Sequence, residues 1–148
     1  MGTIANLKRR IETLDIDRVI TSSFGNTIEQ LADENAVQLS KGETSRDGNF
    51  RSYRNPEYAT MKNRMNPVPG FGNPDLKLTG SFYHGIYARV EGTKIVIDST
   101  DPKTDDLKKK YGDKYIFGLN NKSRSEYLRE FLRPQVARQL EEAIGLNF

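Results

Sequence analysis

Four carboxylates lie close together in the chain, directly after a stretch that we predict to be a β-strand. They are Asp98, Asp101, Asp105 and Asp106. Paired carboxylates bind Mg²⁺, and such sites support phosphodiester chemistry. The same residues also suit helix capping, because Asp101 precedes Pro102 and because Asp105 and Asp106 would lie in a first helical turn, where the dipole favours anions. We favour the capping role and keep a metal-dependent nucleic-acid-processing protein as the alternative.

His84 is the only histidine, and the chain has no cysteine. These counts exclude disulfides, thiolate zinc sites, a cysteine nucleophile and a metal site built from several histidines of one chain. No serine and aspartate partners for His84 can be assigned from the sequence, so we predict a structural role for it. We therefore expect no catalytic residue, no metal and no cofactor.

Three consecutive lysines, Lys108, Lys109 and Lys110, follow the acidic cluster. They fall where the last turn of a helix would favour cations. A second interpretation is that they contact DNA phosphates or face a channel that DNA crosses. A ring of many copies would turn three lysines into a strongly positive collar.

Basic and aromatic residues also alternate between positions 46 and 64. The set comprises Arg46, Arg51, Tyr53, Arg54, Tyr58, Lys62 and Arg64. Such a mixture is typical of surfaces that bind single-stranded nucleic acid. It is equally typical of protein interfaces, in which Arg, Tyr and Met are enriched. We favour a subunit interface, formed by Arg51, Tyr53, Arg54, Tyr58, Met61 and Met65.

These residues belong to a chain of 148 residues, of which 35% are hydrophobic, with a formal net charge of +3. The length fits one domain, and the low hydrophobic share suggests that a partner chain completes some apolar contacts. A charge of +3 is a weak field for nucleic-acid binding by the whole surface. No run approaches 18 apolar residues, and the charged N-terminus has no apolar core of a secretory signal, so we expect no membrane span and no secretion.

Residues 1–41 are predicted to be helical. Asp15 and Asp17 separate two apolar stripes, and Gly25 predicts a kink in the second. The stripes repeat at helical spacing, first as Ile4, Leu7, Ile11 and Leu14, and then as Ile20, Phe24, Ile28, Leu31, Asn35 and Leu39.

Residues 42–75 are predicted to be a long extended loop that contains one short helix at 56–65. The segment holds four prolines and several aromatic residues. Loops of this length without structure of their own are usually functional or disordered, and the aromatic residues argue against simple disorder. We therefore expect an arm that contacts other chains.

Residues 76–119 are predicted to form a small antiparallel sheet with one helix at 102–110. Strands at 86–90 and 94–98 make a hairpin, and Leu76–Leu78 and Tyr115–Phe117 are candidates for further short strands, for a sheet of three strands. Thr79 and Gly80 are predicted to fix the turn that aims the hairpin. Open edges invite strands of a neighbouring subunit, so we also place Ile86 and Ile97 at the subunit interface.

Residues 120–148 are predicted to form a final helix, capped by Ser123 or Ser125. Pro134 lies inside this helix and predicts a distortion near residues 130–133. Helices at both ends around a small antiparallel sheet give an α+β fold in a single domain, residues 1–148.

The segment 75–83, Asp-Leu-Lys-Leu-Thr-Gly-Ser-Phe-Tyr, places a Thr-Gly turn before the predicted hairpin. This turn and the order of the elements resemble small structural proteins of tailed bacteriophages, in the head–tail connector, tail-completion and virion-morphogenesis families. The stretches 58–62, 73–80 and 109–113 also resemble phage and prophage proteins of this sort. The resemblance implies a non-enzymatic ring subunit, with its sheet packed beside that of the next protomer and with long arms that clasp neighbours.

From this resemblance we expect a structural virion protein, assembled in the host cytoplasm, that forms a ring at the neck or tail-terminator region and joins head to tail around the DNA channel. Its partners would be copies of itself, neighbouring connector, portal-side or tail proteins and, non-specifically, DNA, but no membrane. Two alternatives stay open. One is a DNA-binding or metal-dependent nucleic-acid-processing protein that uses Asp98 and Asp101, and the other is a cytoplasmic adaptor domain.

Overall fold

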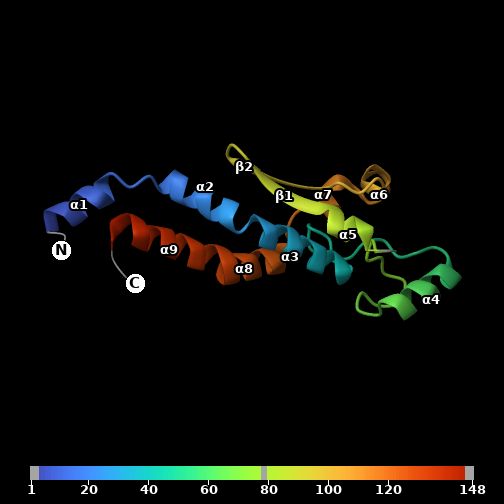
Figure 1. Ribbon diagram of the computed structural model, residues 1–148. Coiled ribbons are helices and arrows are strands. Elements are labelled where there is room, and N and C mark those ends of the chain that lie inside the picture. Colours follow the sequence, from blue (N-terminus) through green and yellow to red (C-terminus); the bar gives the residue numbers. More distant parts are fainter. Residues whose placement is uncertain (1–3, 78–79, 146–148) are drawn as a thin grey trace.

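The computed structural model describes residues 4–77 and 80–145 and shows an elongated molecule (Figure 1). Three helices follow one another along it: α1 (Ile4–Glu12), α2 (Ile16–Asn26) and α3 (Ile28–Ser40). The chain returns beside them through α8 (Asn121–Tyr127), the π-helical turn η1 (Leu128–Leu132) and α9 (Arg133–Ile144). The middle of the chain forms α4 (Pro56–Met65), α5 (Ser81–Gly85), β1 (Ile86–Glu91), β2 (Lys94–Ser99), α6 (Thr104–Tyr111) and α7 (Asp113–Ile116). Helices at both ends and one antiparallel hairpin confirm the predicted α+β fold.

The predicted N-terminal helices are present, with a different break in the second one. Asp15 caps α2 by accepting a hydrogen bond from the backbone N–H of Arg18. The second stripe is divided at Thr27 and not at Gly25. The Thr27 hydroxyl lies 2.8 Å from the Ser23 carbonyl and 2.6 Å from the hydroxyl of Tyr127. A side chain that bonds to the backbone one turn earlier competes with the regular helix.

The hairpin has the predicted strands, in a register that places Ala88 opposite Ile97. A two-residue turn joins the strands, and Gly92 adopts the positive φ that such turns require. The prediction of a third strand is wrong within residues 4–77 and 80–145, where the sheet has two strands. Tyr115 and Ile116 belong to the short helix α7, and Leu76 lies in no strand. Leu78 and Thr79 lie outside the described residues.

The inner face of the hairpin packs against the helices. Ile86 is buried in an apolar cluster with Leu39 and Ile116, and Ile97 contacts both this cluster and a second one around Leu31 and Tyr127. The side chains of Ile86 and Ile97 thus contribute to the core, while the predicted extension of this sheet edge by a neighbouring subunit stays a prediction.

Residues within the final helical segment determine where it begins and where it is distorted. Asn120, and not Ser123 or Ser125, caps α8 by accepting a hydrogen bond from the backbone N–H of Ser123. The turn η1 lies immediately before Pro134, where a distortion was expected. A wider turn accommodates a proline that cannot donate a hydrogen bond and that would clash with the carbonyl one turn earlier.

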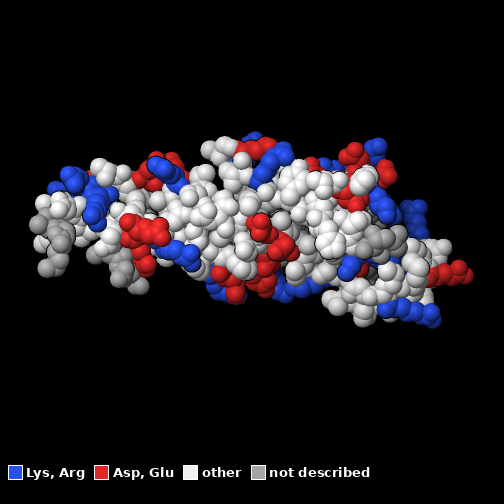
Figure 2. All heavy atoms as spheres, in the orientation of Figure 1, with Lys and Arg blue, Asp and Glu red and all other residues white. Residues whose placement is uncertain are grey.

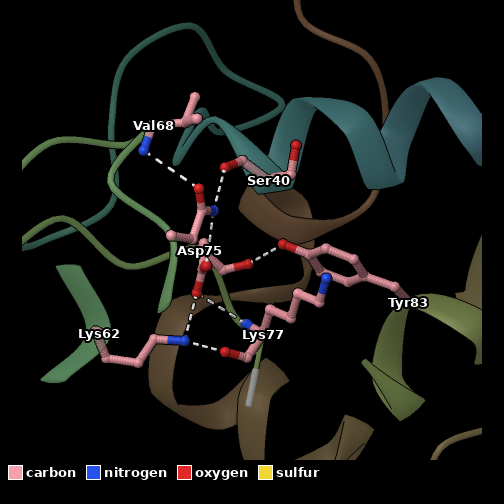
Figure 3. A network of polar contacts seen from close by, with 7 residues as sticks. Ser40, Lys62, Val68, Asp75, Lys77 and Tyr83 are labelled. Atoms are coloured by element: carbon pink, nitrogen blue, oxygen red, sulfur yellow. Dashed lines mark hydrogen bonds and ion pairs between the residues drawn. The ribbon is translucent and has the colours of Figure 1, made fainter. Parts of the chain in front are cut away.

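The segment 42–75 is fastened to the body of the protein and does not extend freely. Phe50 lies in the main apolar cluster. Lys62 and Asp75 form a buried ion pair with 2.7 Å between ammonium and carboxylate, and their side chains are 5% and 3% exposed. Figure 3 shows that Lys62 also donates to the Lys77 carbonyl and that the Tyr83 hydroxyl donates to the Asp75 carbonyl. This part of the predicted extended arm therefore packs on the protein's own body, and contact of the segment with other chains stays a prediction.

Two further hydrogen bonds connect this network to α3. The side-chain N–H of Asn66 donates to the Ser40 carbonyl and to the Asp75 carboxylate, both at 3.0 Å. Its side-chain oxygen accepts from the backbone N–H of Val68 (Figure 3). Together these contacts fix where α4 lies relative to the end of α3. Among the described residues, no helix is both long and apolar enough to cross a bilayer.

Candidate functional site

A cleft of about 850 Å³ separates the chain at 49–58 from the end of α6 and from α7. Five of the residues that line it are aromatic: Phe50, Tyr53, Tyr58, Tyr111 and Tyr115. Three are cationic, Arg51, Arg54 and Lys110, and none is acidic. The structure thus brings the basic and aromatic segment at 51–58 together with the last of the three lysines.

The position of each ring follows from local backbone contacts. The backbone N–H of Tyr53 donates to the Gly72 carbonyl at 2.8 Å. Asn55 caps α4 by accepting from the N–H of Tyr58 at 3.0 Å, and Pro56 occupies the first turn, where its missing N–H costs nothing. Tyr53 and Tyr58 then meet edge to face, with 4.9 Å between ring centroids.

Contacts between side chains also fix the opposite wall of the cleft, at the end of α6. Tyr111 at the end of α6 meets Phe50 edge to face, with centroids 5.3 Å apart. The ammonium of Lys110 lies 5.1 Å from the centroid of the Tyr111 ring. Because Phe50 is part of the core, this wall is anchored to the body of the protein.

A second hollow of about 180 Å³ continues from the first. The two share Tyr53, Tyr58, Lys110 and Tyr111. The second hollow adds the exposed cations Lys77 and Lys103 and again has no acidic residue among those that line it. We call the two hollows together the basic groove, with Arg51, Arg54, Lys77, Lys103 and Lys110 as its exposed cations.

Tyr53 in the groove and Tyr83 beside it are neutral donors. Burial, and after it the nearby charge of Asp75, raises the pKa of Tyr53 well above its ordinary value. The same two causes raise the pKa of Tyr83, which lies beside the groove in the network of Figure 3. These groups can therefore stack and donate hydrogen bonds, but they do not supply a phenolate nucleophile at neutral pH.

The structure divides the three lysines. Lys108 pairs with Asp98 at 2.9 Å and lies over the ring of Phe117. Lys109 is exposed and lines neither hollow, whereas Lys110 lines both. All three lie in the last turn of α6, as predicted. Lys62, which the sequence places among the basic residues of this region, is buried against Asp75 and so is not an exposed cation of the groove.

The acidic cluster is not assembled into one site. Asp98 faces Lys108, and Asp101 accepts from the backbone N–H of Lys103 at 2.8 Å. Asp105 and Asp106 lie in the first turn of α6. Within the described ranges, no group of three His, Asp or Glu side chains could hold a metal ion. His84 is exposed in α5, and no hydrogen bond or ion pair joins it to either Asp98 or Asp101 in the described part of the chain.

The environment of Asp98 gives a testable pH dependence. Burial alone would raise its pKa, but hydrogen bonds from Lys108 and from the N–H of Ser99, with the charge of Lys108, bring the pKa below its ordinary value. The hydrogen bond to Asp98 is the main cause that raises the pKa of Lys108.

We expect Asp98→Asn to lower the free energy of unfolding at neutral pH by at most about 1 kcal/mol, because both partners are partly exposed. The folded-state pKa of Asp98 is lowered, so its contribution is complete above the ordinary value of 3.8 and is lost as the pH falls through the folded-state value. Urea denaturation at several pH values should show that wild type and variant converge in acid. A difference that is equally large at acid and neutral pH would contradict this assignment.

Large apolar side chains remain exposed at both ends of the molecule. At one end, α1 and the start of α2 expose Ile4, Ile11, Ile16 and Ile20, with exposed fractions from 88% to 40%. At the other end, α4 and the loop after it expose Met61, Met65, Val68 and Phe71, with fractions from 41% to 67%. We call these the N-terminal face and the distal patch. Figure 1 places α1 and α4 at opposite ends.

The predicted interface residues therefore fall into two groups. Arg51, Tyr53, Arg54 and Tyr58 line the basic groove, whereas Met61 and Met65 lie in the distal patch. Gly80 has a positive φ and precedes α5, and its role in aiming the hairpin stays a prediction. Tyr111 and Tyr115 were not predicted as site residues. A signal for them exists in the sequence, because Lys110-Tyr111 and Lys114-Tyr115 each place a basic residue beside an aromatic one, as the segment 51–58 does.

Figure 2 shows Lys and Arg side chains on both the α6 side and the lower edge of the end that carries α4, with Asp and Glu side chains at its tip and near α6. Comparison with family models, with curated proteins and with solved structures finds no significant match for this chain.

Proposed function

We propose that this chain is a structural protein of a tailed-phage virion that forms a ring at the neck or tail-terminator region and joins head to tail around the DNA channel. The sequence resemblance at 75–83 and the order of the elements support the family. The observation that carries the proposal is the pair of exposed apolar surfaces at opposite ends of an elongated subunit.

The N-terminal face stays exposed although α1 is attached to the rest of the protein. α1 contacts α9, where the Arg10 guanidinium donates to the Ile144 carbonyl at 3.3 Å, and no residue of α1 is buried. Ile4 is 88% exposed and Ile11 53% exposed, so burying them against another chain would be favourable by about 1.5–3 kcal/mol for each side chain fully removed from water. An amphipathic helix whose apolar stripe stays partly exposed is typical of an interface.

The distal patch supplies a surface of different composition. Two methionines adapt to irregular partners, and Phe71 adds a large ring. Contact between two unlike surfaces at opposite ends of a subunit is heterologous, and such contacts form a ring where the rotation between copies closes and an open filament where it does not. We propose the closed form, a ring of copies with virion neighbours on its two sides.

The mass of the assembled protein, and the assembly formed when two interface variants are mixed, test the proposal. Wild type should form rings, seen by light scattering after size exclusion and by negative-stain microscopy. Ile4→Glu/Ile11→Glu and Met65→Glu/Phe71→Glu should each prevent ring formation, because each places charge in one of the two surfaces. Mixing the two variants should give a heterodimer and nothing larger, since each retains one intact surface.

Val37→Glu is the matched control, because Val37 is 45% exposed on α3, outside both surfaces. It should leave the rings intact. A wild-type chain that stays monomeric, or a ring that survives both double variants, would contradict the proposal. Homodimers of one double variant would instead indicate a two-fold contact through the surface that remains.

A further inference from the structure

We propose that the basic groove binds single-stranded nucleic acid, with its cations on the phosphates and its tyrosine rings on the bases. This inference goes beyond the proposed structural role and does not depend on ring formation. It rests on three properties of the groove: unpaired positive charge, accessible rings and length.

The positive charge of the groove is available to a ligand. Arg51, Arg54 and Lys110 form no ion pair within 4.0 Å among the described residues, and no carboxylate lines either hollow. Lys77 and Lys103 likewise form no ion pair within 4.0 Å among the described residues, although the charge of Lys103 acts on Asp101. Cations that converge on one concave surface attract phosphates and release their counterions.

Aromatic rings lie between these cations. Tyr58 and Tyr115 are 39% and 38% exposed, so their rings can accept a base. Stacking needs the open face of a base, which a single strand offers and a duplex hides. An acidic peptide would satisfy the cations, but it would leave the rings without a matching partner.

The length of the groove favours a strand over a single nucleotide. The two hollows share four lining residues and form one path from Arg51 and Arg54, past Lys110, to Lys77 and Lys103. A repeating backbone of phosphates can meet several of these cations in succession, while successive bases meet the rings.

Fluorescence anisotropy with a labelled oligothymidylate provides the test. Arg51→Ala/Arg54→Ala/Lys110→Ala should weaken binding at least about tenfold at low salt and should lower the slope of log affinity against log salt by about 2, since each phosphate contact to a single strand contributes about 0.7. Tyr58→Ala and Tyr115→Ala should each weaken binding at least about fivefold with little change in that slope.

The matched controls are Lys109→Ala, Arg64→Ala and Tyr87→Ala, which alter residues that line neither hollow. They should bind as wild type does, and circular dichroism should show that all variants are folded. Equal binding of a duplex of the same length, or of polyglutamate, would overturn the proposal in favour of simple charge attraction. It is also overturned if the oligothymidylate does not bind, or if Lys109→Ala weakens binding as much as removal of the groove cations.

Discussion

Asp75→Ala should lower the free energy of unfolding by about 3–5 kcal/mol, because it leaves the Lys62 ammonium buried without its counter-charge. The loss is large against a total stability of about 5–15 kcal/mol for a typical domain. Asp75 also accepts hydrogen bonds from the backbone N–H of Lys77 and from the side chain of Asn66, so three donors lose one acceptor each, and the Lys77 N–H is left without the bond it makes to this carboxylate. Unpaired buried donors add to the cost.

Urea denaturation followed by circular dichroism measures this effect. Glu12→Ala is the matched control, because it also removes a carboxylate from a lysine, but in the pair Lys8–Glu12, whose side chains are 74% and 62% exposed. That control should change stability by no more than about 0.5 kcal/mol. An Asp75→Ala effect as small as that of the control would show that the pair is solvated in solution.

A double variant distinguishes loss of the pair from loss of packing. Lys62→Met/Asp75→Leu removes both charges and keeps apolar volume, so it should be less destabilised than Asp75→Ala. The comparison also bears on function, since the network of Figure 3 positions α4, which carries Tyr58 of the groove and Met61 and Met65 of the distal patch. Asp75→Ala should therefore impair both proposed contacts, even where the chain remains folded.

Elements with strong local signals are those that the sequence predicted well. Pro56 at the first position and Asn55 before it define α4, and alternating residues on both sides of a Gly92 turn define the hairpin. Tyr115–Phe117 was predicted as a strand and is mostly helix, because a short apolar run has no periodicity that separates the two. Ile116 is fully buried in either case, so the burial was predictable and the backbone conformation was not.

The candidate groove shows the limit of reasoning from one sequence. The segment at 51–58 and the lysines at 108–110 each suggested nucleic acid or an interface, but nothing in the sequence places Arg54 near Lys110 and leaves Lys108 elsewhere. That distinction depends on the contact of Phe50 with Tyr111, about 60 positions away in the chain, and on the buried pair of Lys62 and Asp75. The sequence likewise suggests that Lys62 is a surface cation, whereas the structure shows its side chain buried against Asp75.

A polar residue inside an apolar stripe gives the second large prediction. Asn35 shares its face of α3 with Leu31 and Leu39 and is fully buried. Its side-chain N–H donates to the Ile116 carbonyl at 2.9 Å, and its oxygen accepts from the backbone N–H of Gly118 at 3.2 Å. This one side chain therefore fixes the chain between α7 and α8.

Asn35→Ala should destabilise the fold by about 1–3 kcal/mol for each of the two backbone groups that it leaves without a partner. Asp33→Ala, at an exposed position of the same helix, is the control and should be neutral or slightly stabilising, because alanine is the better helix former. Urea denaturation of both variants makes the comparison. A loss below about 1 kcal/mol for Asn35→Ala would mean that water replaces the amide at this site.

Asn35→Asp separates the two hydrogen bonds by pH. The introduced carboxylate would still accept from Gly118, but it would face the Ile116 carbonyl without a proton to donate, so burial and this contact should raise its folded-state pKa. A folded state that binds the proton more tightly than the unfolded state loses stability as pH rises. The variant should therefore lie closest to wild type in acid and diverge from it towards neutral pH. Asp98→Asn should also converge with wild type in acid, but for the opposite reason: there the wild type loses stability as a carboxylate with a lowered pKa is protonated, whereas here the variant gains stability as its introduced carboxylate is protonated. If Asn35→Asp were equally unstable at every pH, the protonated acid would not be replacing the amide as a donor to Ile116.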